Sequence, residues 1–204
     1  MMMLALVRRL PEQLQSIRSR QWKRLETHLL GKRTVGIIGL GRIGRRVAEL
    51  LKPFGTSLVG HDPRVDEAWA RTAGVSLMPL DQLLGSSDIV TIHASQSSEA
   101  SFRLGKKEIR LMKDGAILIN CARGDMVGEN TLIDALKSGK LAGAGLDVFE
   151  TEPYTGELTQ MDNVVLTPHC ATLTEETRVS MEKQAVLNAI GYLRGRADSD
   201  CRVI

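Results

Sequence analysis

Two groups of residues in this sequence could do chemistry, and the first is a set of spaced glycines followed by an acid. Gly39, Gly41 and Gly44 form the pattern G-x-G-x-x-G, and Asp62 follows about 20 residues later. The first glycine of this pattern permits a tight turn, the second lets a pyrophosphate approach the backbone, and the third lets a helix pack closely on a strand. The free N–H groups at the start of that helix attract phosphate. The spacing therefore predicts a dinucleotide-binding site.

Asp62 bears on which dinucleotide binds. A carboxylate accepts hydrogen bonds from the adenosine ribose and repels a 2′-phosphate, so the sequence favours NAD over NADP. Arg64 is close enough in sequence to soften that repulsion. Two alternatives stay open at this point: a glycine-rich turn that binds nothing, and an Asp62 that only shapes the turn before Pro63.

The second group is an arginine, a glutamate and a histidine. They are Arg123 in ILINCARG, Glu152 in GLDVFETEP and His169 in NVVLTPH. An imidazole can take a hydroxyl proton near neutral pH, and a carboxylate on its other ring nitrogen stabilises the cation that forms. An arginine can hold a substrate carboxylate. Beside a nicotinamide ring these groups could oxidise a 2-hydroxy acid, with His169 removing the proton as hydride leaves.

Each of these side chains also has an ordinary explanation. Taken alone, Arg123 is typical of a surface or salt-bridge arginine. Glu152 before Pro153 is typical of a loop acid, and His169 after Pro168 of a hydrogen-bonded loop histidine. Spacing along the sequence does not decide whether the three meet.

The elements that must position these groups alternate between strands and helices. Strands are expected at 35–40, 57–60, 75–77, 88–93, 116–120, 141–148 and 163–166, with helical segments between most of them. This alternation predicts an α/β fold with a doubly wound parallel sheet of Rossmann type and helices on both faces. Ligands of such sheets bind beyond the carboxyl ends of the strands, where both groups of residues are found.

The two ends of the chain flank this alternation. Residues 1–10 are expected to form an apolar helix with no preceding element to pack on, so an upstream segment or a partner chain should cover it. A long helix capped by Thr172 or Thr174 is expected near the other end. We therefore divide the chain into an N-terminal helix and connector (1–30), a dinucleotide-binding domain (31–171) and a C-terminal helix and tail (172–204).

Composition limits the classes of function. The chain of 204 residues is 43% hydrophobic and 25% charged with a net charge of +3, which is ordinary for a soluble globular protein and shows no nucleic-acid face. No apolar run reaches transmembrane length. Cys121, Cys170 and Cys201 share no metal-binding spacing and cannot all pair. We expect no metal site, and free thiols in a reducing cytoplasm.

Taken together, the motifs resemble the D-isomer-specific 2-hydroxyacid dehydrogenases. The stretch TPH-x-A-x-L-T-x-E-T-R is similar to phosphoglycerate dehydrogenase-like members of that family. The similar stretches are GKRTVGIIGLGRIGRRVA, HDP, SDIVTIH, LMKDGAILINCARGDMV, LIDALKSGKLAGAGLDVFETEP and DNVVLTPH, in family order. The resemblance implies Arg123 as the substrate-binding arginine, Glu152 as the acid paired with the histidine, and His169 as the general acid/base. It also implies Asp147 near the nicotinamide carboxamide, and a homodimer through the nucleotide domain. The expected NAD contacts are Gly39, Gly41, Arg42, Ile43, Gly44, Asp62, His93, Cys121, Ala122 and Asp147.

Two departures from the family pattern matter. The usual His-x-Pro is His93-Ala94-Ser95 here, followed by residues 96–100, so a looser loop over the adenine side is expected. Relatives also have most of a substrate domain before the point where this chain starts. We therefore expect that domain to be absent and the apolar faces of the first and last helices to be exposed. The favoured function is an NAD-dependent 2-hydroxyacid dehydrogenase; the alternative is a stand-alone NAD-binding dimeric module or a truncated fragment without useful turnover.

Overall fold

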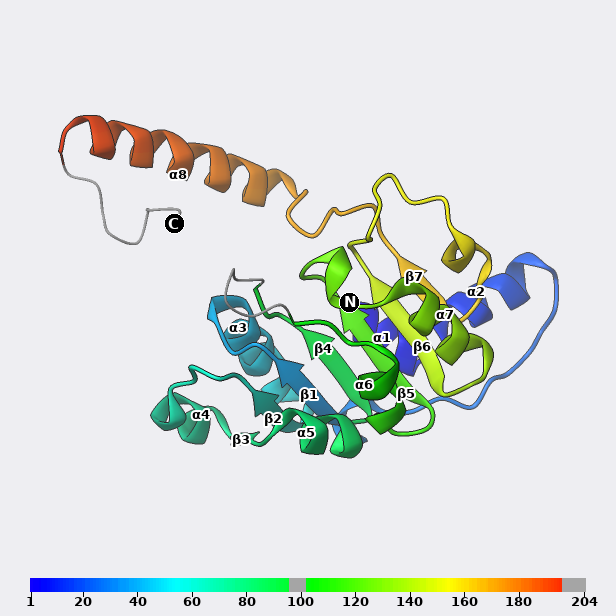
Figure 1. Ribbon diagram of the computed structural model, residues 1–204. Helices are drawn as coiled ribbons and strands as arrows, with labels where there is room; N and C mark the ends of the chain where they lie inside the picture. The colour runs from blue at the N-terminus through cyan, green and yellow to red at the C-terminus, as the bar shows by residue number, and fades with distance from the viewer. Residues whose placement is uncertain (96–101, 196–204) are drawn as a thin grey trace. The chain divides into compact units, whose positions relative to one another are not determined.

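A computed structural model describes residues 1–95 and 102–195 and divides the chain into two compact units, Met1–His169 and Cys170–Ile204 (Figure 1). The first unit contains a sheet of seven strands, all paired in parallel, in the order β3-β2-β1-β4-β5-β6-β7. The strands are β1 Thr34–Ile38, β2 Ser57–His61, β3 Val75–Leu77, β4 Ile89–Ile92, β5 Ala116–Asn120, β6 Leu141–Leu146 and β7 Val164–Leu166. This order confirms the predicted doubly wound sheet, and it reverses direction between β1 and β4, where such folds bind ligands.

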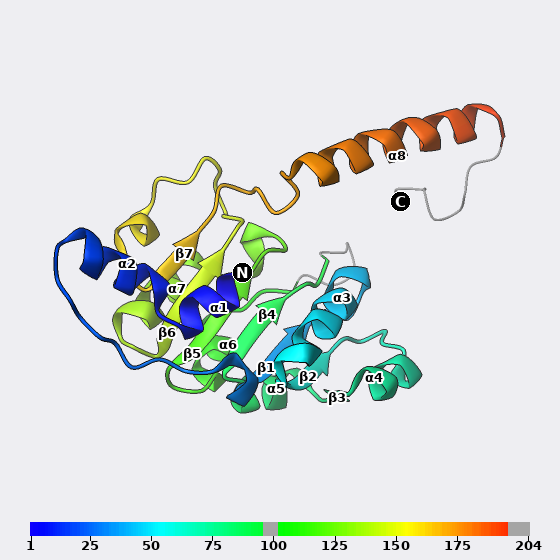
Figure 2. The ribbon, with the colours of Figure 1, turned by 180° about the vertical axis from the view of Figure 1, so that it is seen from behind.

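Helices cover both faces of the sheet (Figures 1 and 2). Along β5, Leu118 packs into the core beneath α5, α6 and α7, whereas Ile117 and Ile119 pack into the core beneath α1, α3 and α4. Strand side chains alternate between faces, so an uninterrupted apolar run is what a strand buried on both sides requires. The helices of this unit are α1 Met2–Val7, α2 Leu10–Arg18, α3 Arg42–Leu51, α4 Glu67–Ala73, α5 Leu80–Ser86, α6 Lys106–Leu111 and α7 Glu129–Lys137, with short 3-10 turns η1 Leu30–Lys32, η2 Lys52–Phe54, η3 Gly124–Met126 and η4 Glu157–Gln160.

The first helix differs from its prediction in length and in surroundings. It ends at Val7, because Arg9 adopts a left-handed conformation with φ 49° and a separate helix begins at Leu10. Its apolar side chains, Met2, Leu6 and Val7, are buried in the core on the sheet. The expectations that this face lacks a packing partner and is exposed are therefore wrong.

Glycines in β6 explain why α1 fits on the sheet. A Cβ atom at Gly143 would lie 3.0 Å from Leu6 Cδ2, and one at Gly145 would lie 3.0 Å from Met2 Cβ. The strand LAGAGL thus lacks side chains where the helix approaches most closely. The glycines of β6 and the apolar side chains of α1 therefore pack against each other.

The second unit contains α8 Glu175–Leu193. Thr174 caps this helix, since its hydroxyl accepts a hydrogen bond of 3.2 Å from Thr177 N, which decides between the two predicted caps. No residue of α8 is buried, and Val179, Val186 and Ile190 are exposed, as was expected for the last helix. Among the described helices, none has both the length and the apolar character needed to cross a membrane. The predicted boundaries at 30/31 and 171/172 stay predictions.

Candidate active site

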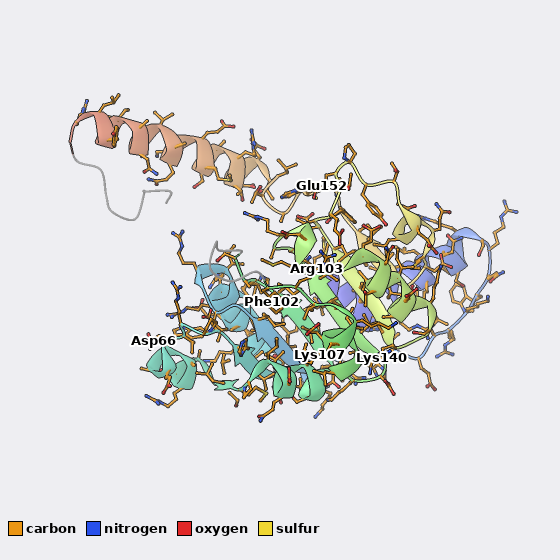
Figure 3. All side chains as sticks on the ribbon, in the orientation of Figure 1. Asp66, Phe102, Arg103, Lys107, Lys140 and Glu152 are labelled. Carbon is orange, nitrogen blue, oxygen red and sulfur yellow. The ribbon has the colours of Figure 1, made fainter. Side chains whose placement is uncertain are left out.

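The last residues of six strands are paired side by side across the sheet, and the predicted site residues lie just beyond them. In sheet order, these row positions are His61, Ile38, Ile92, Asn120, Leu146 and Leu166. Asp62, Gly39, His93 and Asp147 are each the next residue after a row position, and Arg123, Glu152 and His169 follow within the same loops. Glu152 therefore lies at the opposite end of the sheet from Lys140, which precedes β6 (Figure 3).

The glycine turn after β1 has the steric requirements expected of a phosphate-binding turn. Gly39 has φ 89°, and a Cβ atom there would lie 2.4 Å from Ala94 N. A Cβ atom at Gly44 would lie 1.9 Å from Gly39 O, so α3 packs directly on the turn. Gly41, the N-cap of α3, is different, because nothing lies within 4 Å of its Cβ position. The first and third glycines are required by packing, whereas the second leaves open space at a helix start.

Arg42 and Ile43 occupy the first turn of α3, next to that open space. Both side chains are exposed, and 68% of the surface of Ile43 is accessible although it is apolar. An exposed isoleucine beside an open turn can be covered by a bound ligand. These residues, with Gly41, fit the phosphate end of a dinucleotide.

Asp62 lies against the glycine turn. Its Oδ2 atom accepts a hydrogen bond of 2.7 Å from Leu40 N, and its Oδ1 atom accepts one of 2.8 Å from Arg64 N. The second bond is the turn-shaping role, and the first places the carboxylate beside the glycines. Each carboxylate oxygen has a further lone pair that can accept a ribose hydroxyl, so the two roles are compatible.

His93 follows β4 and is held in a neutral state. Its backbone N donates to Ile38 O at 2.7 Å, and its Nε2 atom lies 3.0 Å from Thr91 Oγ1. Burial lowers the pKa of His93 to about 4, so the ring carries no charge at neutral pH. The stretch 96–100, on which we expected a looser loop, lies outside the described residues.

A buried asparagine shapes the turn that carries Arg123. Asn120 is only 1% exposed; its Oδ1 accepts from Ala122 N at 3.0 Å, and its Nδ2 donates to Arg123 O at 2.8 Å. The Arg123 side chain is exposed and donates from Nη1 to Ala122 O at 2.7 Å. A Cβ atom at Gly124 would lie 1.9 Å from Phe149 O, so this turn packs against the loop that carries Glu152.

Cys121 precedes Arg123 in the turn after β5, and Asp147 is the first residue after β6. Asp147 is 2% exposed, and its Oδ1 accepts a hydrogen bond of 2.5 Å from Thr167 Oγ1. Burial, together with the charge of Asp147, raises the pKa of the Cys121 thiol. The thiol therefore remains protonated and weakly nucleophilic at neutral pH.

Glu152 and His169, predicted as a pair, are in contact. His169 Nδ1 lies 2.9 Å from Glu152 Oε2, and Glu152 Oε1 accepts from Phe149 N at 3.0 Å. The hydrogen bond with His169, supported by that from Phe149 N, lowers the pKa of Glu152. His169 has a left-handed backbone with φ 50°, and its N–H donates to Thr167 O at 3.0 Å. With Nδ1 engaged, Nε2 is the ring nitrogen left for a substrate proton.

Arg123 lies near this pair without being joined to it. Between it and the pair, the described residues show no hydrogen bond; Arg123 follows β5, whereas His169 follows β7, with β6 between. The side chains of Arg123 and His169 are both exposed at this edge. The arrangement can bind an anion at Arg123 and exchange a proton at His169.

A large pocket lies at the opposite end of the sheet, near the amino ends of the strands. It measures about 970 Å³ and is lined by residues such as Arg33, Asp88 and Lys113, which lie near the amino ends of strands, and by the connector after α2. The predicted chemical groups and the pocket therefore lie at opposite ends of the sheet. We assign the site to the end with the chemical groups, since none of the predicted site residues lines the pocket. Within residues 1–95 and 102–195, no cluster of three His, Cys, Asp or Glu side chains could hold a metal ion.

The sequence indicates only part of what holds the site in place. The rule that ligands bind beyond the carboxyl ends of strands points to Asn120 at the end of β5, but not to the two hydrogen bonds of its amide. Thr167, the polar residue after β7, was not predicted. Nothing in the spacing pointed to Tyr154, whose hydroxyl donates to Glu129 Oε1 at 2.9 Å from a distant part of the chain. Such contacts depend on the fold and leave no periodic signal.

Comparison with known proteins supports the motif-based resemblance. The family described as D-isomer specific 2-hydroxyacid dehydrogenase, NAD binding domain, matches residues 1–171. D-3-phosphoglycerate dehydrogenase of Archaeoglobus fulgidus is 40% identical over 185 residues, which cover 88% of this chain and 35% of the relative. Glyoxylate reductase of Thermococcus litoralis is 38% identical over 204 residues, covering 95% of this chain and 62% of the relative.

Solved structures agree with these relatives. D-lactate dehydrogenase of Aquifex aeolicus, complexed with NAD and lactic acid, superposes with a TM-score of 0.85 at 31% identity, covering 95% of this chain and 64% of that one. A glyoxylate reductase of Paecilomyes thermophila gives 0.85 at 33% identity, covering 93% and 58%. The chain thus spans about a third to two thirds of the length of these proteins. It belongs to the D-isomer specific 2-hydroxyacid dehydrogenase family, and what it contains is that family's NAD-binding domain.

Proposed function

We propose that this chain is the cofactor-binding and proton-transfer part of an NAD-dependent dehydrogenase that interconverts a 2-hydroxy acid and a 2-keto acid. The observation that carries the proposal is the 2.9 Å contact between Glu152 and His169 at the same sheet edge as the glycine turn. The relatives named glyoxylate reductase and D-lactate dehydrogenase support a small hydroxy or keto acid as substrate.

The chain's own residues divide the chemistry between them. Arg123 holds the substrate carboxylate by a charge-assisted hydrogen bond. His169 takes the hydroxyl proton on Nε2 during oxidation and returns it during reduction. Glu152 holds Nδ1 and stabilises the imidazolium that forms. NAD, when bound, accepts the hydride, and NADH returns it.

The cofactor residues follow from the same edge of the sheet. Open space at Gly41 would receive the pyrophosphate, and Asp62 would accept hydrogen bonds from the ribose hydroxyls, which favours NAD over NADP. Buried Asp147 would contact the nicotinamide end of the cofactor. The remaining proposed contacts are Gly39, Arg42, Ile43, Gly44, His93, Cys121 and Ala122.

A second function deserves a test: an NAD-binding module or fragment with little turnover. The side chain of His169 is 56% exposed, and Arg123 is exposed as well, so water reaches the catalytic groups of the chain studied alone. Excluding water and fixing the substrate contribute on the order of 7–11 kcal/mol to catalysis through orientation. The test is to titrate the chain with NADH and then add hydroxypyruvate, pyruvate or 2-ketoglutarate while following NADH absorbance. Turnover that is lost in His169→Ala supports the enzyme; binding without turnover supports the module.

We propose a second copy of the chain as a partner, as the resemblance implies. The resemblance places the dimer contact in the nucleotide domain, whereas the exposed apolar surface described next lies in the N-terminal segment before that domain. The helix α2 buries no apolar residue, and Leu10, Leu14, Ile17 and Trp22 on it and its connector are exposed, Trp22 by 85%. Burial of this surface in a homodimer would remove apolar area from water. Sedimentation velocity of the wild type and of Ile17→Asp tests this: a dimer that becomes a monomer supports the proposal, and a wild-type monomer contradicts it.

The proposed compartment is the cytoplasm. Cys121 forms no disulfide within the described residues, which suits a reducing environment. Fractionation of cells that express the tagged chain would test this assignment, and recovery in an oxidising compartment would contradict it.

A further inference from the structure

In the loop that carries Glu152, a residue before Glu152 and a residue after it both form hydrogen bonds with Glu129 of α7. Glu150 Oε1 accepts a hydrogen bond of 3.2 Å from the backbone N of Glu129, the first residue of α7. Tyr154 OH donates a hydrogen bond of 2.9 Å to the side chain of the same residue, at Glu129 Oε1. Glu152 lies between these two anchors in the chain.

Inside the loop, contacts through Phe149 connect Tyr154 to Glu152. The rings of Tyr154 and Phe149 are stacked, with centroids 4.4 Å apart and planes inclined by 14°. The backbone N of Phe149 donates to Glu152 Oε1 at 3.0 Å, and Glu152 Oε2 meets His169. A change in the position of Tyr154 would therefore be transmitted through Phe149 to the carboxylate.

Further hydrogen bonds hold Glu150 and Tyr154 in place. Arg103 Nη2 donates to Glu150 Oε1 at 2.6 Å (Arg103 is labelled with Glu152 in Figure 3), and Leu158 N donates to the Tyr154 hydroxyl oxygen at 3.3 Å. Burial, with the nearby carboxylate of Glu129, raises the pKa of Tyr154, so its hydroxyl remains a donor at neutral pH. The Glu129–Tyr154 bond thus persists under the conditions in which the site would work.

We infer that Glu129 is a positioning residue for the Glu152–His169 pair, acting through Tyr154 and Phe149. The inference rests on the proposed function of that pair. Glu129 touches neither member of it, so its effect must come through the loop. The competing explanation is that these contacts only stabilise the fold.

The test measures the protonation of Glu152 in the full chain. Groups that face this carboxylate are His169 and the N–H of Phe149, which favour its charged form, and the more distant charge of Asp147, which opposes it. If the loop is released, the favourable contacts weaken and the pKa of Glu152 rises. A change in overall stability alone would leave this titration where it is.

The variants are Glu129→Ala, Glu129→Gln and Tyr154→Phe, with Asn130→Ala as an exposed control on the same helix. The glutamate carboxyl carbons are labelled and titrated by NMR, and the Glu152 signal is assigned with Glu152→Gln. We expect an upward shift in Glu129→Ala and in Tyr154→Phe. In the double variant of Glu129→Ala and Tyr154→Phe, the pKa of Glu152 should rise no further than in either single variant, because both changes break the same series of contacts. Glu129→Gln keeps an acceptor for the tyrosine and should titrate like the wild type, as should the control.

The outcomes separate this inference from the proposed function. If Glu129→Ala and Tyr154→Phe lower thermal stability but leave the Glu152 titration unchanged, the contacts are structural and the inference is overturned. The affinity of the same samples for NADH is measured by calorimetry. A wild type that binds no NADH contradicts the proposed function whatever the titration shows, whereas equal affinity with shifted titrations supports both.

Discussion

His169 Nδ1 lies 2.9 Å from Glu152 Oε2, and this contact joins the loop after β6 to the end of β7. The two residues are separated in the chain by a loop and a strand, yet each is also held by a backbone hydrogen bond near the contact. A histidine whose tautomer is set by a carboxylate is suited to move a proton at its other nitrogen. The catalytic account depends on this pair.

The contact predicts a specific dependence of stability on pH. Since the folded-state pKa of Glu152 is lowered, its contribution is present above the unfolded value of about 4.3 and is lost as pH falls through the folded value. Glu152→Gln should remove this contribution. The difference in urea midpoint between wild type and variant should therefore shrink between about pH 5 and pH 3. A difference that is constant across this range would show that the pair has no ionic character.

The two glycines around the start of α3 should respond differently to alanine. A methyl group at Gly44 would lie 1.9 Å from Gly39 O, so Gly44→Ala should lower the free energy of unfolding by about 1–3 kcal/mol. Gly41→Ala meets nothing within 4 Å and should change stability by less than about 0.5 kcal/mol. It should nevertheless weaken NAD binding about tenfold, since the methyl group occupies the phosphate approach. Urea titration and calorimetry measure the two effects, and unchanged NAD affinity in Gly41→Ala would contradict the assignment of this turn.

The charge of Asp62 should set the choice between NAD and NADP. Asp62→Ser removes the carboxylate that accepts from Leu40 N, and the preference for NAD should fall by about tenfold, or about 1.4 kcal/mol. Asp62→Asn keeps an acceptor oxygen without the charge and serves as the control for turn geometry. Both variants should lose selectivity if charge is the cause. If the ratio of NAD to NADP affinity stays the same in both, Asp62 is only a turn residue.

Cys121 should react slowly with alkylating agents. Its pKa is raised by burial and by Asp147, so the reactive thiolate is scarce at neutral pH and becomes common only above the ordinary value of about 8.5. Iodoacetamide labelling followed by peptide mass spectrometry should show a rate that still rises with pH beyond that value. Asp147→Asn removes the nearby charge and should speed the reaction at neutral pH. Rapid labelling of the wild type at pH 7 would show that the site is more open than the structure indicates.

Much of the fold could be predicted because its strands are buried on both faces. The run AILIN predicts β5 with its observed bounds, Ala116–Asn120, and the alternation of strands and helices predicts the parallel, doubly wound sheet but not the order of its strands. The packing of α1 could not be predicted, since it depends on Gly143 and Gly145 of a strand more than a hundred residues away. Periodicity reveals that a face is apolar without revealing its partner.

The candidate site shows the same division. The Glu152–His169 contact was predicted from the family resemblance, and the positions of both residues after neighbouring parallel strands are consistent with it. The hydrogen bonds that position this pair and the arginine turn could not be predicted. The Asn120 amide bonds two backbone groups of its own turn, and Tyr154 bonds Glu129, which is 25 residues away in the chain. Chemistry-bearing residues have recognisable types, whereas the residues that position them are chosen by geometry.

Calorimetric titration of the wild-type chain with NAD is the most direct test of the central claim. We predict saturable binding of NAD to one site per chain. Gly41→Ala should bind NAD more weakly than the wild type, and the wild type should bind NADP more weakly than NAD. A folded wild-type chain that releases no heat on addition of NAD, and shows no NAD-dependent rise in melting temperature, would contradict the assignment of the glycine turn and of everything built on it.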